Sequence, residues 1–317
     1  MNLLQEHKAS AIESCIVQKF SVILWCFLIT SNYNVVKKIL KRLITGIIYV
    51  ALIVAPLLAS SALPFLIIFS LFTVLGVNEF HNIIDKGDDT RKHGRIVMYM
   101  DMTGAVMMFV ALFFEYYSQA LEHIWLVVAL IYFVVRMVTQ LYIKSPNAIK
   151  DIAISMMGIA YVAIPISLLN VIYFAYSQKI LLATFIFIWI NDTGAYCVGS
   201  TIGKHRLFEK VSPKKSWEGF WGGLVFCVIA AWLMYNCNEF FNGPDLLVWI
   251  GFGLIVSIFA TLGDLCESLI KRTLKVKDSG SLLPGHGGIL DRIDSLLIVA
   301  PSILVYFMII AFFSNLQ

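Results

Sequence analysis

The chain has 317 residues, of which 59% are hydrophobic and 14% are charged, and its mean hydropathy is +0.83. A water-soluble domain is about half apolar and about a quarter charged. The composition therefore excludes an ordinary soluble domain and predicts a membrane protein. The net charge of +4 is small, its distribution matters more than its sum, and we expect no nucleic acid as a partner.

Residues 1–40 form an N-terminal extension to which we assign no role. Residues 20–30 are apolar but too short to span a bilayer, so they suit an interfacial helix. The extension lacks the small-residue cleavage site of a signal peptide.

Residues 41–317 are predicted to form one membrane-embedded domain. Each apolar segment is near the roughly 20 residues that cross the hydrocarbon as a helix, and helices suit segments joined by short gaps. We therefore predict an all-α, polytopic transmembrane bundle of about nine spans. The segments are 43–59, 63–84, 96–114, 123–142, 152–175, 180–198, 218–236, 246–270 and 289–313.

Positive charge is concentrated on alternate sides of these spans. Most of the 24 lysines and arginines precede span one or lie near the gaps after spans two, four, six and eight. The other gaps carry acidic residues, with Lys179 as their basic residue. The positive-inside rule predicts a multi-pass protein of the inner membrane, with a cytoplasmic N-terminus if residues 20–30 do not span, and the C-terminus outside.

Span six contains the sequence WINDTGAYCVGS. An ionisable group inside a span costs about 2.5–3.5 kcal/mol, which favours a functional role for Asp192. Asp192 and Tyr196 are four residues apart and share a helix face. The alternative is a buried hydrogen-bonded contact between helices.

The gap after span six contains SPKKSWEG. Lys214 and Lys215 lie near the hydroxyl of Ser212, and Trp217 suits the aromatic belt at the interface. This basic loop could clamp a triphosphate or merely touch anionic lipid.

Span eight ends in TLGDLCESLIKR. Its polar residues recur at helical spacing on one stripe, and they are Asp264, Glu267, Ser268 and Lys271. Facing a wet cavity, these groups suit a hard cation and a phosphate, whereas the alternative is an intramembrane ion pair.

A glycine-rich segment, PGHGGILDRIDS, leads into span nine. Gly287 and Gly288 follow His286 and would let backbone N–H groups approach an anion, just before a helix N-terminus. Asp291 and Asp294 share a face of that helix, with Arg292 beside them, and could complete a metal site opposite Asp264. Two acidic residues elsewhere, Glu79 and Asp101, are weaker candidates, and Glu79 is interpreted as a structural partner.

Together, these segments resemble the signature of the phosphatidate cytidylyltransferase (CDP-diacylglycerol synthase) family. The match runs from Ser268 through Lys271-Arg272, Lys277-Asp278 and the glycine-rich segment to Asp294. SPKKSWEG and NDTGAY are also similar to family segments, although threonine is more usual at Ser216. The resemblance covers roughly residues 40–315 and excludes the extension.

The resemblance implies that CTP and phosphatidic acid are converted to CDP-diacylglycerol and pyrophosphate. It implies Mg²⁺ held by Asp264 and Asp291, leaves a second cation and a homodimer open, and involves membrane lipid. The site would lie among the cytoplasmic ends of spans six, eight and nine. The catalytic residues would be Asp264, Asp291, Lys271 and Arg292; the substrate-binding residues Ser212, Lys214, Lys215, Arg272, Lys277, His286, Gly287 and Gly288; and the supporting residues Asp192, Glu267, Ser268 and Asp294.

Two other functions fit parts of the pattern. A CTP-dependent polyprenol kinase would transfer the γ-phosphate to an alcohol, and the signature favours cytidylyl transfer instead. A transporter would also bury charges, but it should show internal repeats and broken helices, and we see no repeat.

Overall fold

The computed structural model describes residues 40, 42–87, 95–119, 122–241, 244–280, 282 and 287–314. It divides into a small unit, Met1–Val50 with Pro284–His286, and a large unit, Ala51–Leu283 with Gly287–Gln317. In the small unit the described residues are helical. The predicted interfacial helix at residues 20–30 and His286 lie outside the described residues.

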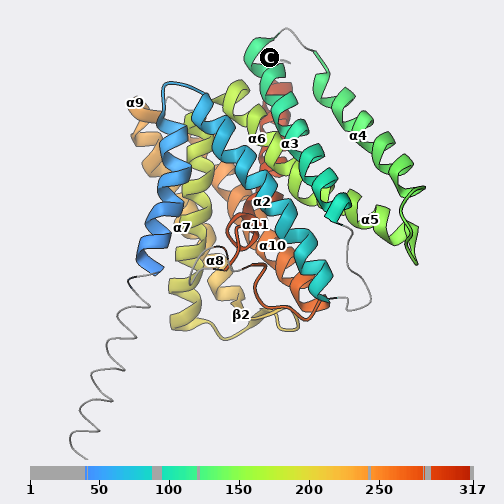
Figure 1. Ribbon diagram of the computed structural model, residues 1–317. Helices are drawn as coiled ribbons and strands as arrows, with labels where there is room; N and C mark the ends of the chain where they lie inside the picture. Colours follow the sequence, from blue (N-terminus) through green and yellow to red (C-terminus); the bar gives the residue numbers. More distant parts are fainter. Residues whose placement is uncertain are drawn as a thin grey trace, which may run out of the picture. The chain divides into compact units, whose positions relative to one another are not determined.

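The described chain is almost entirely helical (Figure 1). A helix at Arg42–Leu58 is followed by α2 (Leu63–Gly87), α3 (Arg95–Ser118), α4 (Ile124–Gln140), α5 (Ala148–Gly158), η1 (Ile159–Ala163), α6 (Ile164–Val171), η2 (Ile172–Tyr176), α7 (Gln178–Ile202), α8 (Trp217–Asn236), α9 (Asn238–Phe241), α10 (Leu246–Thr273) and α11 (Leu290–Ser314). The segments α5 to η2 form one continuous helix, Ala148–Tyr176, with two π-helical turns.

The predicted apolar segments all form helices, with ends that agree to within a few residues. Among the described residues, seven helices are long and apolar enough to cross a membrane, whereas Arg42–Leu58 and Ile124–Gln140 are apolar but shorter. The chain is therefore an all-α, multi-pass membrane protein, as predicted. The span count of nine and the sides on which the termini lie stay predictions.

Small residues bring α7 and α8 close together. A side chain at Gly222 would collide with Val198, and one at Gly194 would collide with Phe226. Membrane helices commonly use small residues in this way, because close backbone approach maximises van der Waals contact where no hydrophobic effect drives association.

A polar stripe attaches α4 to its neighbours. The buried side chains of α4 are Tyr132, Arg136 and Gln140, spaced four residues apart on one face. The Tyr132 hydroxyl donates to Asp101 of α3 at 2.7 Å, and Arg136 Nε donates to Ser155 Oγ of α5 at 2.8 Å. Asp101, a weaker candidate for the site, therefore belongs to a buried structural network between helices.

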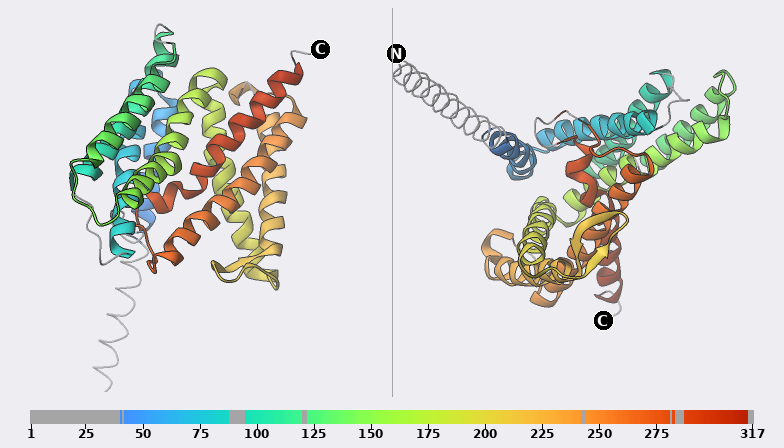
Figure 2. Two further views of the ribbon diagram at one scale, coloured as in Figure 1. Left: turned by 90° about the vertical axis from the view of Figure 1, so that its right-hand side faces the viewer. Right: turned by 90° about the horizontal axis from the view of Figure 1, so that it is seen from below.

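The basic gap after α7 is a β-hairpin rather than the loop expected from the sequence. Strands β1 (Arg206–Phe208) and β2 (Ser212–Ser216) pair antiparallel, with Arg206 opposite Ser216. The sequence did not indicate these strands, because β1 has only three residues and β2 is mostly polar. Seen from below, the hairpin lies against the ends of the helices (Figure 2, right).

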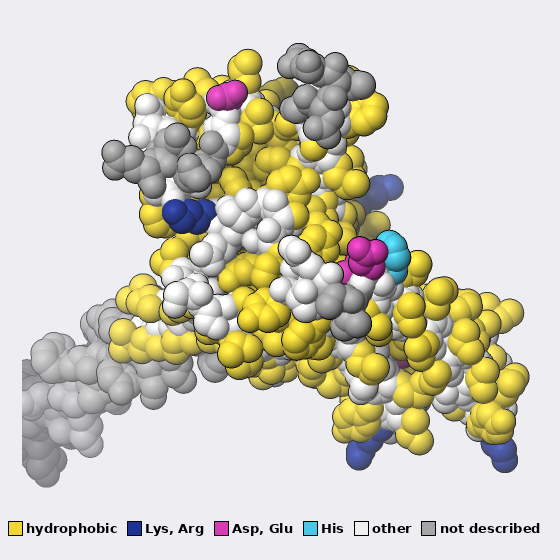
Figure 3. All heavy atoms as spheres, turned by 90° about the horizontal axis from the view of Figure 1, so that it is seen from above, with side chains coloured by type: hydrophobic (Ala, Val, Ile, Leu, Met, Phe, Trp, Pro, Cys, Tyr) yellow, Lys and Arg dark blue, Asp and Glu magenta, His cyan; other side chains and the backbone are white. Residues whose placement is uncertain are grey.

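Three predicted cytoplasmic gaps meet at this end of the large unit. Arg272 Nε at the end of α10 donates to the Val211 carbonyl of the hairpin turn at 3.3 Å, and Gly87 at the end of α2 lies against Leu274. The view from the opposite end shows mostly hydrophobic side chains, with scattered Lys, Arg, Asp, Glu and His among them (Figure 3). The basic gaps after α2, α7 and α10 therefore lie together at one end of the large unit.

Candidate active site

A pocket of about 610 Å³ lies between α7, α8, α10 and the hairpin. It brings together four predicted site residues from three elements: Asp192, Lys214, Lys215 and Asp264. Tyr196 also lines the pocket, and its side chain is 75% exposed. The sequence placed the cavity among spans six, eight and nine, but the walls come from spans six, seven and eight and the hairpin.

Glu218 at the start of α8 holds the hairpin in place. Its carboxylate accepts hydrogen bonds from the backbone N–H groups of Lys204 at 3.1 Å and His205 at 3.2 Å, and it contacts His205 Nδ1 at 2.6 Å. Ser216 caps the same helix by accepting from the Gly219 N–H at 3.1 Å. The two lysines therefore project from a backbone that is fixed at its base.

Asn191 and Asp192 were each considered either for a functional role or for a buried contact between helices. Asn191 is 1% exposed, accepts from Ser257 Oγ at 2.6 Å and donates to Thr261 Oγ1 at 3.4 Å. It joins α7 to α10 through these buried hydrogen bonds, and both Asn191 and Asp192 line the pocket. The alternative interpretation is thus correct for Asn191, and the neighbouring carboxylate remains available for function.

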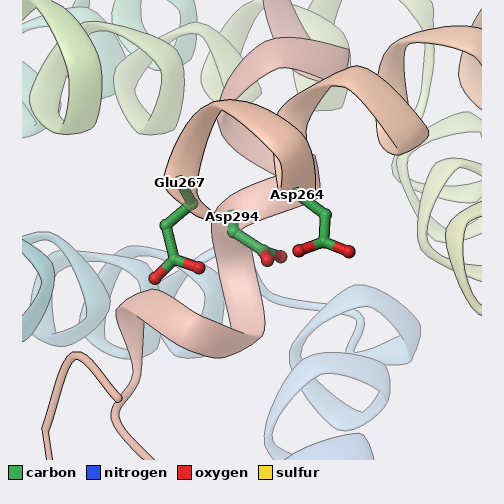
Figure 4. A group of neighbouring side chains, drawn as sticks. All are labelled: Asp264, Glu267 and Asp294. Atoms are coloured by element: carbon green, nitrogen blue, oxygen red, sulfur yellow. The ribbon is translucent and has the colours of Figure 1, made fainter. Parts of the chain in front are cut away.

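Three carboxylates converge beside the pocket. One oxygen each from Asp264 and Glu267 of α10 and Asp294 of α11 lies within 4.8 Å of the others. Figure 4 shows the carboxylate of Asp294 between the other two. Because Asp264 also lines the pocket, the cluster and the pocket share a wall.

Gly263 makes this convergence possible. A Cβ atom at this position would lie 2.9 Å from the Asp294 carbonyl oxygen and 2.9 Å from Ser295 Cα. The backbones of α10 and α11 therefore touch one residue away from Asp264. No larger residue would allow the two helices to approach so closely.

Two lysines neutralise the cluster from opposite sides. Lys215 Nζ lies 2.6 Å from Asp264, and Lys271 pairs with both Glu267 and Asp291, the latter at 2.8 Å. Ser268 Oγ donates to Asp264 at 3.3 Å. The predicted stripe on span eight thus forms an ion pair between Lys271 and Glu267 and also contributes Asp264 and Glu267 to the carboxylate cluster.

Asp291 does not belong to the three-carboxylate group, although the sequence paired it with Asp264. Its two oxygens accept from Lys271 Nζ and from the backbone N–H groups of Ser279 at 3.0 Å and Gly288 at 2.8 Å. At the start of α11 its side chain folds back onto free N–H groups, as carboxylates commonly do there. Asp294, nearly one turn deeper, faces α10 instead.

From Gly287 onward, the glycine-rich segment is anchored by protein carboxylates. Gly287 has φ +84°, a conformation that favours glycine, and the Gly288 N–H donates to Asp291. Glu79 of α2 accepts from Ser279 Oγ at 3.0 Å and from the Leu290 N–H at 2.8 Å, in agreement with its predicted structural role. These N–H groups therefore bind carboxylates of the protein, where the sequence suggested an anionic ligand.

The remaining predicted residues surround the site less closely. Arg272 and Lys277 are exposed near the end of α10, and Arg292 is exposed on α11. Ser212 opens β2 outside the pocket lining. Sequence reasoning missed Arg206 and Thr261, which line the pocket, and Glu218. The S-x-E pattern at 216–218, typical of a capped helix start, could have drawn attention to Glu218.

The carboxylate cluster has the donor chemistry that a hard cation requires. Mg²⁺ binds oxygen ligands, commonly one or two carboxylates together with substrate phosphates. Three converging carboxylates repel one another, and a cation among them would relieve that repulsion. The residues present therefore fit a Mg²⁺ ion.

Comparison with known proteins decides the family. Residues 40–310 match the family model described as the cytidylyltransferase family. The chain belongs to this cytidylyltransferase family. The match covers all the predicted site residues and begins where the N-terminal extension ends.

Several bacterial relatives of this cytidylyltransferase family member are named phosphatidate cytidylyltransferase. Proteins from Staphylococcus aureus, Staphylococcus haemolyticus and Staphylococcus saprophyticus are 43%, 42% and 44% identical to the chain over 162, 164 and 160 residues. Each match covers 50% of this chain and 60% of the relative. The chain thus spans about 60% of the length of the curated relatives it matches.

Proposed function

We propose that this chain transfers CMP from CTP to phosphatidic acid, giving CDP-diacylglycerol and pyrophosphate. The observation that carries the proposal is the shared wall at Asp264, where a pocket with a basic rim adjoins a carboxylate cluster suited to a cation. Nucleotidyl transfer needs both parts side by side. The names of the bacterial relatives support the same reaction.

In this reaction a phosphate oxygen of the lipid attacks the α-phosphorus of CTP. A new phosphorus–oxygen bond forms as the bond from the α-phosphorus to the bridging oxygen breaks, and pyrophosphate leaves with that electron pair. The attacking oxygen is already anionic, so the protein needs no strong general base. Its task is to position two polyanions and neutralise their charge.

The lysines and arginines at the rim suit this task. Lys214, Lys215 and Arg206 line the pocket and are placed to hold nucleotide phosphates. Lys271, held between Glu267 and Asp291, presents a fixed ammonium group to the far side of the cluster. We propose that Asp291 acts through Lys271 and the glycine-rich segment.

We propose that Asp264, Glu267 and Asp294 hold Mg²⁺, in place of the pair Asp264 and Asp291 expected from the sequence. When bound there, the ion would neutralise phosphate charge near the reacting phosphorus. Lys215 and Lys271 flank the ligands and complete the charge balance. A second cation would use substrate phosphates or Asp192 as ligands rather than Asp291, which already accepts several hydrogen bonds.

We further propose that the protein lies in the inner membrane with this site facing the cytoplasm, where CTP is available. The lipid substrate would arrive from the membrane itself. A homodimer, left open by the sequence, is tested by the mass of the purified protein with its detergent subtracted.

One assay tests the reaction. Full-length protein in detergent is given phosphatidic acid, Mg²⁺ and CTP that carries a label on either the α- or the γ-phosphate. We expect the α-label in CDP-diacylglycerol and the γ-label in pyrophosphate. Transfer of the γ-label to a lipid would instead establish a kinase and overturn the proposal.

A further inference from the structure

Lys215 stands between the pocket and the carboxylate cluster. Its ammonium lies 2.6 Å from an Asp264 oxygen and donates to the Thr261 carbonyl at 3.3 Å, while its side chain lines the pocket. Lys214 lines the same pocket, yet within the described part of the chain no carboxylate lies within ion-pairing distance of it. Of these two adjacent lysines, Lys215 is therefore the one that is paired with a carboxylate of the cluster.

A cation bound by Asp264 would compete with this ammonium. Both are attracted to the same carboxylate, and a divalent ion and an ammonium group placed side by side would repel each other. The ion pair is partly exposed, at 25% for Lys215 and 35% for Asp264, and pairs of that kind are weak enough to exchange. Triphosphate oxygens in the pocket would offer the ammonium charge-assisted hydrogen bonds in return.

We propose that Lys215 is an exchangeable counter-ion that couples nucleotide binding to cation binding. It neutralises Asp264 until nucleotide phosphates draw its ammonium into the pocket, which releases the carboxylate to the cation. This inference rests on the proposed function and specifies the order in which that site is filled, with nucleotide phosphates drawing the ammonium away before the cation takes the carboxylate. Its consequence is that the two ligands bind cooperatively, and that the protein takes up a divalent cation weakly without nucleotide.

The geometry allows the side chain to move while the backbone stays fixed. Glu218 clamps one end of the hairpin, and Arg272 donates to the carbonyl at its turn. Lysine has a flexible four-carbon stem with a compact charge at its end. Exchange therefore needs only rotations within one side chain.

The test measures Mn²⁺ binding to the full-length protein in detergent, without nucleotide, by electron paramagnetic resonance of the free ion. In Lys215→Met the competing charge is gone, and we expect about two- to fivefold tighter Mn²⁺ binding, the size of a partly exposed ion pair. Lys214→Met removes the same charge from the same pocket, and we expect a change of less than about twofold. Lys215→Gln serves if the Met variant does not fold.

A second measurement repeats the titration with CTP present. CTP chelates Mn²⁺ equally in every sample, so this contribution cancels between variants. If the coupling exists, adding CTP should raise the Mn²⁺ affinity of Lys215→Met less than that of Lys214→Met. Unchanged or weaker Mn²⁺ binding by Lys215→Met, or an equal gain in both variants, would overturn the inference. Neither readout needs turnover, so failure here is distinguishable from failure of the wild-type protein to make CDP-diacylglycerol.

Discussion

Gly263→Ala should separate the two helices that build the carboxylate cluster. The added Cβ would meet the Asp294 carbonyl oxygen and Ser295 Cα at 2.9 Å, and ordinary contacts begin at 3.4 Å. Both opposing atoms belong to the backbone, so no side chain can rotate out of the way. The helices must move apart by about 0.5 Å at this point, because a packed interface cannot absorb the methyl group.

The expected effects on stability and on turnover differ in size. Overpacking costs about 1–3 kcal/mol, while replacing a helical glycine by alanine returns about 1 kcal/mol. The net destabilisation should therefore be at most about 2 kcal/mol, and the protein should still purify. A displacement of about 1 Å at a reactive centre can cost about 100-fold in rate, so half of that predicts about a tenfold loss of turnover.

Gly253→Ala is the matched control on the same helix. Its Cβ would meet Phe187 Cε1 at 3.0 Å and the Cys227 carbonyl at 3.1 Å, so it is nearly as crowded, but it lies ten residues from Gly263. The assay compares turnover at saturating CTP and lipid with the melting temperature of each variant. If both variants lose turnover equally, or if Gly263→Ala keeps normal turnover despite a lower melting temperature, close approach of α10 and α11 is not what assembles the site.

Three further predictions follow from the site. Asp264→Asn and Asp294→Asn should each weaken Mn²⁺ binding and lower turnover by about 100-fold or more, with partial rescue at best by excess Mg²⁺. Asp291→Asn should lose turnover but keep its Mn²⁺ affinity. An equal loss of Mn²⁺ affinity in Asp291→Asn would restore Asp291 as the ligand. Glu218→Gln should raise the apparent KM for CTP several-fold with kcat nearly unchanged, because it loosens the hairpin. Glu209→Gln on the exposed turn serves as its control. A fall in kcat alone would contradict this role of Glu218. In intact cells, a thiol label should reach the exposed Cys237 from outside and a Lys210→Cys variant, with other cysteines replaced, only from the cytoplasm; labelling of both from one side would refute the predicted topology.

The helices were predictable because their signal is local and strong. A span needs about 20 apolar residues wherever it packs, so its position can be read from composition. The hairpin at Arg206–Ser216 was not predictable, because its strands are short and are held by Glu218 and Arg272 from other elements. Buried networks such as Asp101 with Tyr132 likewise depend on partners distant in the sequence.

The all-α membrane fold, the concentration of basic residues on alternate gaps and most of the candidate site residues can be read from the amino-acid sequence alone. Which carboxylates lie together depends on how the helices pack. The sequence paired Asp264 with Asp291 and left Asp294 as a supporting residue, although Asp291 and Asp294 are three residues apart on one helix. Their roles separate because Asp291 satisfies free N–H groups at the helix start, whereas Asp294 lies where Gly263 brings α11 against α10. That close approach is a property of two helices together, and neither segment contains it alone.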